Sequence, residues 1–572
     1  MGRSGASPTL PAMDRRTSLV LLAVLGTGVF LAGLELMITA VALPAIVVDL
    51  GSWTELRHAS WTINAYLLVF VGTMPLAGRL ADAWGVRRIF LAALLAFTLG
   101  SLLAGMAQTL DQLIAARAVQ AVGGGALVPV ATAAASHLFE GHARPRALGI
   151  IGALTFLGMA AGPFLGAAIL DFVRPEAALA QAGLLATPLG DLLAPAWRYV
   201  FYVNVPIGIV ALAFGWAATA GWDTPRTRGR VDVAGAVLFT GALGAILLGV
   251  TLLGEQGGAA GGAGLDPTAV SAALVAGGIV AGVVAVAHGL RHPDPFLDPR
   301  LFRDRVFSSA ALVSLLTGYA FATAIVGSAV FVDRVLYGGP DDQRLALGAL
   351  AAATAAGALV SGWLVRHWSL RGVTAVGLAA SIAGLAWMST WDATVTYQVI
   401  AAAGGLFGLG FGLTVTPRST AAVEAVGRAR FGAASAAVTV ARMIGMAVGL
   451  AVLTAYGSTA IDRLSAQVFG SPDAYREIVP PELADRPLRD PLVVDALEAW
   501  AAEQAAETMV GLFLVAAVVT AVAIPPGLAL GSRPRMLRDE TAGQAGGAAA
   551  GGVGGDGIGP GPDGEAEPTL AL

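Results

Sequence analysis

Long apolar runs, separated by short segments that carry the charged residues, dominate the sequence. Only 13% of the 572 residues are charged and 56% are hydrophobic, whereas about 25% are charged in an average soluble chain. A helix of about 20 apolar residues is long enough to cross a bilayer. The pattern therefore predicts an all-α polytopic membrane protein with 14 transmembrane helices. The expected spans are about 17–45, 59–80, 88–107, 112–137, 146–172, 198–219, 233–254, 268–288, 307–334, 344–366, 371–390, 394–417, 430–457 and 506–530.

The basic residues predict the orientation of these spans. An even number of spans places both termini on the same side of the membrane. Most of the 34 basic residues, all of them Arg, fall in the two tails and in alternate loops on that side. The positive-inside rule identifies this side as cytoplasmic. We therefore expect a multi-pass protein of the cell membrane with both termini in the cytoplasm.

Two segments repeat at an offset of 284 residues. GRLADAWGVR (78–87) and GWLVRHWSLR (362–371) share Gly, Leu, Trp and Arg, and each follows the second span of its half. Such repeats predict two pseudo-symmetric six-helix bundles with the substrate between them. The expected organisation is a cytoplasmic N-tail (1–16), an N-terminal bundle (17–219), two linker helices with cytoplasmic loops (220–306), a C-terminal bundle (307–530) with an external loop (458–505), and a disordered cytoplasmic tail (531–572).

Several function classes are excluded or disfavoured by the residue types. The chain has no Lys, so it lacks the Walker A loop of P-loop ATPases, and it has no Cys, so thiolate metal sites and disulfides are excluded. The six His residues form no HExxH motif and have no acid at metal-ligand spacing, so no metal is predicted. A membrane-embedded enzyme or sensor would need a nucleophile with a base, or an output domain, and neither is visible. No cofactor is expected, and transport would draw on an ion gradient.

The stretch FLAGLELMITAVALP (30–44) contains a single carboxylate, Glu35. A charge at the bilayer centre costs about 2.5–3.5 kcal/mol, so Glu35, Arg117 and Arg442 are expected to face a bundle interior and to pair. Burial disfavours a charged carboxylate and a nearby Arg favours it, so alternating these surroundings would load and release a proton. The alternatives for Glu35 are a static bridge to an Arg, or an acid that reaches interfacial water. Arg117 could instead be structural, bound to backbone carbonyls or Gln120, and Arg442 could pair with Glu35.

Several motifs resemble the major facilitator superfamily. GRLADAWGVRR (78–88) is similar to its loop between helices 2 and 3, and GMAAGPFLG (158–166) to its antiporter motif on helix 5. LELMITAVALP (34–44) and WRYVFYVNVPIG (197–208) resemble its 14-helix drug:proton antiporter branch. The resemblance implies a proton-coupled antiporter that exports amphiphilic small molecules, such as drugs or lipids, by alternating access. The alternative is an importer or uniporter on the same scaffold. The motif residues are Gly78, Asp82, Gly85, Arg87 and Arg88 in the first segment, and Gly158, Gly162, Pro163 and Gly166 in the second.

The motif residues have structural alternatives. Asp82 is either a helix-capping acid paired with Arg87 or Arg88, or a cytoplasmic latch broken during alternation. Ala83 and Val86 stand where the family usually has basic residues, so a thinner charge network is expected around Asp82. The helix-5 glycines, like those of GGLFGLGFG (404–412), are expected to pack helices closely, and Pro163 favours a bend.

A closer resemblance is to the mycobacterial exporters of drugs and triacylglycerol that work with a lipid-binding lipoprotein. WTINAYLLVFVGTMPLAGR (61–79), FGAASAAVTVARMIGM (431–446) and the long loop before the last span are the similar segments. This resemblance implies coupling roles for Glu35 and Arg442, and a periplasmic or extracellular lipoprotein partner at 458–505. That loop is otherwise a helical hairpin extending the last two helices. The helix-5 acid of these exporters aligns with Thr155 or Phe156, so it is missing here.

An apolar and aromatic cavity lining suits amphiphilic cargo, because such pockets bind through contact area with few fixed polar groups. The cavity candidates are Asn64, Tyr66, Asn204, Trp363, Trp387 and Gln398.

Overall fold

The computed structural model describes residues 15–531, apart from 51–55, 142, 220–221, 223, 225–231, 255–266, 294, 296–297, 427–429 and 470–473. Every regular element in these ranges is a helix, as the apolar runs predicted. Thirteen helices among the described residues are long and apolar enough to cross a membrane, and a shorter apolar stretch, Val233–Gly249, lies at the seventh of the fourteen expected spans. The expected tails lie outside the described residues, apart from Arg15, Arg16 and Gly531.

The N-terminal bundle corresponds to the first six expected spans. Its sixth span consists of a short 3-10 turn, which begins directly after Pro195, and two helices that are separated at Val203. The elements are α1 (Arg15–Leu50), α2 (Leu56–Trp84), α3 (Val86–Met106), α4 (Leu110–Leu138), α5 (Ala143–Phe172), α6 (Pro175–Gln181), α7 (Pro188–Leu193), η2 (Ala196–Arg198), α8 (Tyr199–Tyr202) and α9 (Asn204–Ala218).

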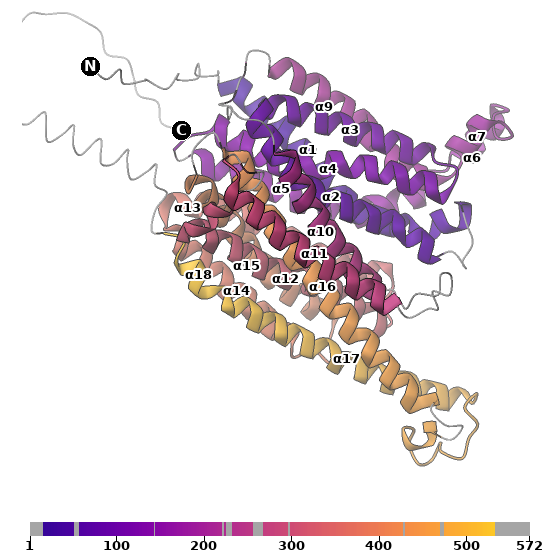
Figure 1. The fold of residues 1–572 in the computed structure, drawn as a ribbon. Coiled ribbons are helices and arrows are strands. Elements are labelled where there is room, and N and C mark those ends of the chain that lie inside the picture. Colours follow the sequence, from indigo (N-terminus) through magenta and orange to yellow (C-terminus); the bar gives the residue numbers. More distant parts are fainter. Residues whose placement is uncertain are drawn as a thin grey trace, which may run out of the picture.

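The C-terminal bundle ends in an extended hairpin. Its helices α16 and α17 continue well beyond the expected spans, and Figure 1 shows their ends protruding at the same end of the molecule as α6 and α7. Tyr475, Val479 and Val493 form a small apolar cluster there. The elements are η3 (Pro299–Arg303), α12 (Arg305–Arg334), α13 (Pro340–His367), α14 (Leu370–Met388), α15 (Tyr397–Glu424), α16 (Phe431–Phe469), η5 (Ala474–Glu477), α17 (Pro491–Val522) and α18 (Ile524–Leu528).

The packing of the two bundles repeats. Within the first bundle α1 contacts α5, α4 contacts α2 and α3, and α3 contacts α9. The equivalent contacts in the second bundle are α12 with α16, α15 with α13 and α14, and α14 with α17. Helices α13 and α14 begin 284 residues after α2 and α3, at the offset of the sequence repeat. The repeated segments therefore occupy equivalent places in two related bundles.

The linker helices α10 (Val233–Gly254) and α11 (Pro267–Arg291) form a hairpin beside the two bundles. Figure 1 shows this pair lying along the boundary between the indigo-to-purple N-terminal bundle and the orange-to-yellow C-terminal bundle. Helix α10 contacts α2 of the first bundle and α16 of the second. The linker helices thus cover the seam at which α2 meets α16.

Candidate functional site

Glu35 lies on α1 with its side chain fully buried. Its carboxylate forms an ion pair with Arg117 of α4. Oε1 also accepts a hydrogen bond from Thr39 Oγ1 at 2.9 Å, and Oε2 accepts one from Asn204 Nδ2 of α9 at 2.7 Å. Both carboxylate oxygens are therefore hydrogen-bonded, which offsets the high cost of burying a charge.

Arg117 is buried as well and contacts several groups besides Glu35. Its Nε donates to the carbonyl oxygen of Thr62 at 3.1 Å, and its Nη1 donates to Gln120 Oε1 at 2.6 Å. Gln120 in turn donates to Ser101 Oγ at 2.7 Å. The guanidinium carbon lies 4.0 Å from the ring centroid of Tyr66, within the range of a cation–π interaction. The network draws on α1, α2, α3, α4 and α9, all in the N-terminal bundle.

The three deeply placed charges are only partly brought together. Glu35 pairs with Arg117, and the expected alternative pairing with Arg442 is not found, because Arg442 lies on α16 of the other bundle. Arg117 also makes the contacts with a backbone carbonyl and with Gln120 that a structural role predicted. Arg117 therefore makes both kinds of contact, the ion pair with Glu35 and the structural hydrogen bonds.

Arg442 lies against an aromatic ring instead of an acid. Its guanidinium carbon is 5.5 Å from the ring centroid of Phe156, and its Nε has no hydrogen-bond partner. Phe156 is one of the two positions at which the resemblance predicted that an acid is missing. A second buried arginine, Arg418 of α15, donates to Thr317 Oγ1 at 2.6 Å. In the part of the chain that the structure describes, neither Arg418 nor Arg442 forms an ion pair.

Sequence reasoning missed Arg418 because it ended the twelfth span at residue 417. Helix α15 instead continues to Glu424 and carries Arg418 into the protein. The signal was present in the sequence, since the apolar and small residues STAAV directly follow Arg418.

Aromatic side chains fill part of the interface between the bundles. The ring centroids of Phe156 and Phe321 are 5.5 Å apart, those of Phe156 and Phe411 are 5.4 Å apart, and Phe321 stacks on Phe411 at 4.4 Å. These rings come from α5, α12 and α15, so both bundles contribute to the cluster. Two small cavities of about 30 Å³ and about 10 Å³ lie beside it.

Asp82 connects the two bundles. Its Oδ1 accepts a hydrogen bond from the backbone N–H of Gly432 at 2.8 Å, and its Oδ2 accepts one from Ala433 at 2.7 Å. These donors lie in the first turn of α16, where the N–H groups have no partner within the helix. Asp82 therefore caps a helix of the opposite bundle, rather than its own helix.

The rest of this motif builds the connection between α2 and α3. Gly85 has φ 95°, a conformation that favours glycine, and it allows α3 to begin directly after α2. Arg87 Nε donates to Thr219 Oγ1 at 2.8 Å, and Arg88 is exposed. Gly78 faces α16, and a Cβ at residue 78 would lie 2.5 Å from the carbonyl oxygen of Gly432. The two helices are therefore in backbone contact beside the Asp82 cap.

The helix-5 motif packs α5 against α1. A Cβ at Gly158 would overlap the carbonyl oxygen of Phe30, and one at Gly162 would lie 2.8 Å from Met37 Cβ. Gly166 faces Ile38 in the same way. Helix α5 runs through Pro163 without interruption, so the motif residues act together as one close-packed face.

The cavity candidates divide into two groups. Tyr66 and Asn204 are buried in the Glu35–Arg117 network, and Asn64 is half-buried on α2. The other three side chains are exposed and belong to the C-terminal bundle: Trp363, Trp387 and Gln398. The two Trp residues are near the ends of α13 and α14, where aromatic side chains commonly meet the membrane–water interface.

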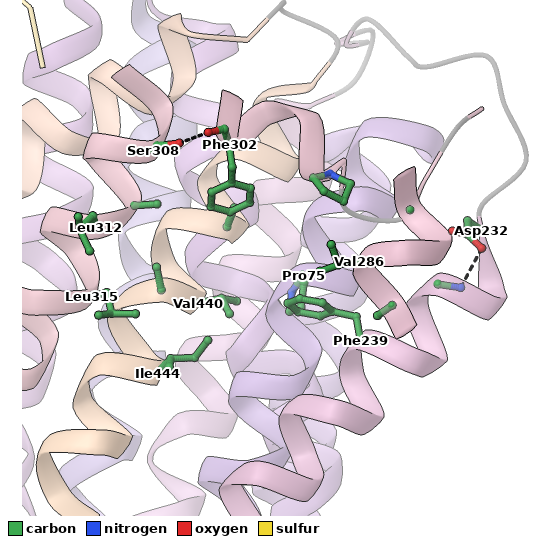
Figure 2. Close-up of a pocket in the computed structure, with 17 residues that line it drawn as sticks. Pro75, Asp232, Phe239, Val286, Phe302, Ser308, Leu312, Leu315, Val440 and Ile444 are labelled. Atoms are coloured by element: carbon green, nitrogen blue, oxygen red, sulfur yellow. Dashed lines mark hydrogen bonds between the residues drawn. The ribbon is translucent and has the colours of Figure 1, made fainter. Parts of the chain in front are cut away.

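An apolar cavity of about 660 Å³ lies where the linker helices meet both bundles. Figure 2 shows Phe239 and Val286 of the linker pair facing Val440 and Ile444 of α16, with Phe302 above them. Helices α2 and α12 complete the wall. Sequence reasoning placed the cargo site between the bundles and missed this cavity, since no motif marks its lining.

The family is decided by a match over most of the chain. Residues 25–450 match the family model described as the Major Facilitator Superfamily. The chain belongs to this superfamily. This confirms the resemblance that the motifs indicated. The protein is thus a multi-pass membrane transporter whose helices form two related bundles.

Similar curated proteins are named as transport, export or drug-resistance proteins. This superfamily member is 31% identical to a triacylglyceride transporter of Mycolicibacterium hassiacum over 79% of this chain and 82% of that protein. It is 33% identical to the cephamycin export protein of Amycolatopsis lactamdurans, over 78% of this chain and 87% of that protein. Multidrug resistance protein 3 of Bacillus subtilis is 27% identical, over 72% and 74% of the two chains.

Solved structures show the same fold. A bacterial homologue of the human lysosomal transporter Spinster, in an inward-facing conformation, aligns with a TM-score of 0.56 and 17% identity, over 91% of this chain and all of that chain. The human organic anion transporter MFSD10 aligns with a TM-score of 0.55 and 14% identity, over 88% and 99% of the two chains. At these identities the likeness concerns the fold alone.

Proposed function

We propose that this superfamily member is a proton-coupled antiporter that exports amphiphilic small molecules or lipids by alternating access of its two bundles. Both termini lie in the cytoplasm, in line with the distribution of the arginines. The end of the molecule that contains Asp82 then faces the cytoplasm, and the α16–α17 hairpin faces outward. That hairpin is the surface at which the resemblance would place a lipid-binding lipoprotein.

The buried Glu35 network is the observation that carries the proton-coupling proposal. Glu35 is fully buried and is the carboxylate of a network whose other charged member is Arg117. We infer that a proton that enters this network resides on Glu35. Protonation would neutralise the carboxylate and weaken its pairing with Arg117, and deprotonation would restore it.

The proposed cargo class rests on the apolar cavity and on the names of the relatives. Hydrocarbon side chains from α10, α11, α12 and α16 line the cavity of about 660 Å³, so it suits an alkyl chain. Asp232 and Ser308 are its polar lining residues. One relative is named as a triacylglyceride transporter and another as a cephamycin export protein, and the acyl chains of a triacylglyceride match the apolar lining of this cavity.

Substitution of Glu35 by Gln is the test of coupling, because it removes the titration and keeps the shape. We expect the wild-type protein in liposomes to move a fluorescent lipid or a cationic dye faster when a pH gradient is imposed. The Glu35→Gln variant should lose this dependence on the gradient. Asp392→Asn is the control, since it makes the equivalent change from a carboxylate to an amide at an exposed loop position.

Two results would count against the proposal. If the Glu35→Gln variant keeps the gradient dependence of the wild type, Glu35 has only a packing role. If net movement runs toward the side that carries the termini, the protein is an importer on the same scaffold.

A further inference from the structure

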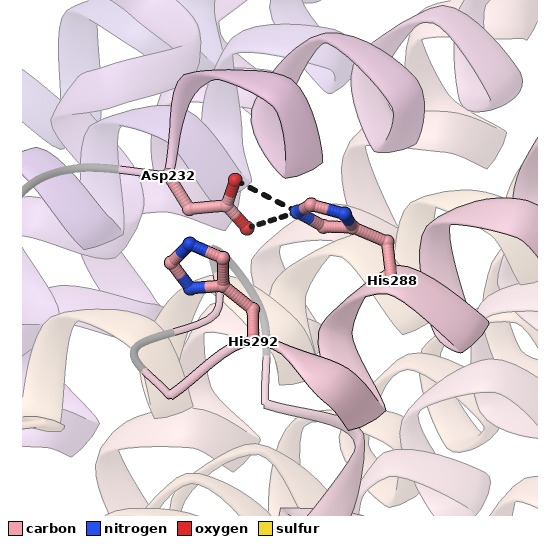
Figure 3. A group of neighbouring side chains, drawn as sticks. All are labelled: Asp232, His288 and His292. Atoms are coloured by element: carbon pink, nitrogen blue, oxygen red, sulfur yellow. Dashed lines mark hydrogen bonds and ion pairs between the residues drawn. The ribbon is translucent and has the colours of Figure 1, made fainter.

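Three side chains of the linker hairpin lie together at one end of it. Asp232 directly precedes α10, and His288 and His292 lie at the end of α11 (Figure 3). His288 Nε2 is 3.0 Å from Asp232 Oδ1 and 3.2 Å from Oδ2. One ligand atom from each of the three residues can be chosen so that all lie within 4.8 Å of one another.

The sequence alone did not predict this group. The acid of the group, Asp232, is 56 residues away from His288 along the chain, so no short motif marks it. The hairpin of α10 and α11 brings them together. His288 and His292 are four residues apart, so they project from the same side of the helix end, and their ring centroids are 5.4 Å apart.

The carboxylate of Asp232 is held in a defined position. Its Oδ1 accepts a hydrogen bond from the backbone N–H of Gly235 at 2.8 Å. A Cβ at residue 235 would overlap Asp232 Oδ2, so the glycine leaves room for the carboxylate. The Asp232 side chain is only 2% exposed, whereas the His288 side chain is 30% exposed. An ion could therefore approach from the His side and meet a pre-oriented oxygen ligand.

Two imidazoles and one carboxylate form a donor set that suits a divalent first-row transition metal. Zinc sites of this type use three protein ligands at about 2.0–2.2 Å and keep solvent at the fourth position. Ligands around such a tetrahedral ion are about 3.4 Å apart, by the geometry of those bond lengths. The His288–Asp232 contacts, at 3.0 and 3.2 Å, are close to this spacing, and the ligand atom of His292 lies within 4.8 Å of both partners, so the ion would draw it inward.

We propose that Asp232, His288 and His292 bind one divalent transition-metal ion of the zinc class and thereby tie the start of α10 to the end of α11. The ion replaces the His288–Asp232 ion pair with bonds to all three residues. Asp232 also lines the apolar cavity of about 660 Å³, so the bound ion would fix one edge of that cavity. This proposal is independent of the direction and coupling of transport.

The chain contains a natural control for this site. His58 Nε2 lies 3.0 Å from Asp111 Oδ1, and both side chains are more exposed than those of the proposed site. This pair has the same contact distance as His288 and Asp232, but it belongs to no group of three metal ligands among the described residues. A His58→Ala variant therefore removes one imidazole and leaves the proposed site intact.

The experiment uses the untagged full chain in detergent after treatment with a chelator. Titration with Co²⁺ should give saturable 1:1 binding with the strong visible bands of a tetrahedral ion, and Zn²⁺ should displace it. The His292→Ala variant should bind Co²⁺ at least about 10- to 100-fold more weakly, a loss that even an outer partner of a metal site can cause. His58→Ala should bind as the wild type does.

Thermal unfolding without metal checks the fold of each variant, and His292→Ala keeps the His288–Asp232 pair. Zn²⁺ should raise the melting temperature of the wild type and of His58→Ala, but not that of His292→Ala. The proposal is overturned if the wild type shows no saturable 1:1 binding. It is also overturned if His292→Ala binds as tightly as the wild type, or if His58→Ala loses as much affinity as His292→Ala.

Discussion

Replacement of Asp82 by Asn is expected to open the end of the molecule at which α2 meets α16. In the structure the two carboxylate oxygens accept the N–H groups of Gly432 and Ala433 at 2.8 and 2.7 Å. An Asn side chain keeps one acceptor oxygen, but its NH₂ group would face the second N–H. The variant therefore loses one hydrogen bond to a charged group, together with the favourable interaction of the charge with the helix N-terminus.

The expected size of the effect follows from these contacts. A hydrogen bond to a charged group contributes about 1.5–3 kcal/mol. Since about 1.4 kcal/mol corresponds to a factor of ten, the ratio of closed to open molecules should fall about 10- to 100-fold. Once this end is open, solvent hydrates both groups, so the loss applies only to the closed form.

A distance measurement across the interface can detect this shift. Trp84 ends α2, Trp368 follows α13, and their side chains are 54% and 53% exposed. The chain has no Cys, so spin labels can be attached at Trp84→Cys and Trp368→Cys without removing other thiols. Electron–electron resonance should show longer distances in Asp82→Asn than in the parent, and Asp392→Asn should not change them. Identical distance distributions in Asp82→Asn and the parent would refute the latch.

Three further predictions concern packing, buried charge and cargo. Gly158→Ala should destabilise the protein by about 1–3 kcal/mol, because the new methyl group would overlap the carbonyl oxygen of Phe30. Its melting temperature should fall, whereas that of Gly511→Ala should not, because a methyl group at residue 511 would meet no neighbouring atom. Arg442→Met removes a buried unpaired charge, so the melting temperature should stay unchanged or rise, with a gain in the free energy of unfolding of up to about 4 kcal/mol. The same variant should reduce transport in liposomes. Leu312→Trp should slow lipid transport, because Leu312 lines the apolar cavity, and it should change the melting temperature little, because Leu312 is 45% exposed. Unchanged lipid transport would contradict a role of the cavity.

Much of the fold could be predicted because hydropathy and topology are local properties of the sequence. The apolar runs identified the membrane helices, and the repeat of Trp84 at Trp368 identified equivalent places in two bundles. The ends of the helices were less predictable. Helix α16 continues to Phe469, because a helix need not end where its apolar run ends, provided that solvent or another helix covers the polar turns.

The candidate site was less predictable than the fold because its contacts depend on helix rotation. The sequence identified Glu35 and Arg117 as deep charges, but it could not determine which Arg shares a bundle interior with the acid. It also proposed Trp363 for the cavity lining, whereas the rotation of α13 leaves this side chain 59% exposed. The group around His288 was missed for a different reason, since it depends on the close approach of the two linker helices.

The location of the Glu35 network limits how coupling can work. Every partner of the carboxylate belongs to the N-terminal bundle, so a rocking of the two bundles as rigid bodies would leave the pairing with Arg117 in place. What such a motion changes is the covering of α1 by the other bundle. Gly33 and Leu36 border a small cavity together with Phe321 and Arg442 of the C-terminal bundle.

Separation of the bundles would therefore expose the face of α1 next to Glu35 and would move Arg442 away from it. Water could then reach the network, and the field of a buried cation would weaken at the same time. Both changes alter the surroundings of the Glu35 carboxylate, in a manner that depends on which end of the molecule is open. The proposed proton coupling would thus proceed through solvent access and the position of Arg442, with the Glu35–Arg117 pair as the fixed element.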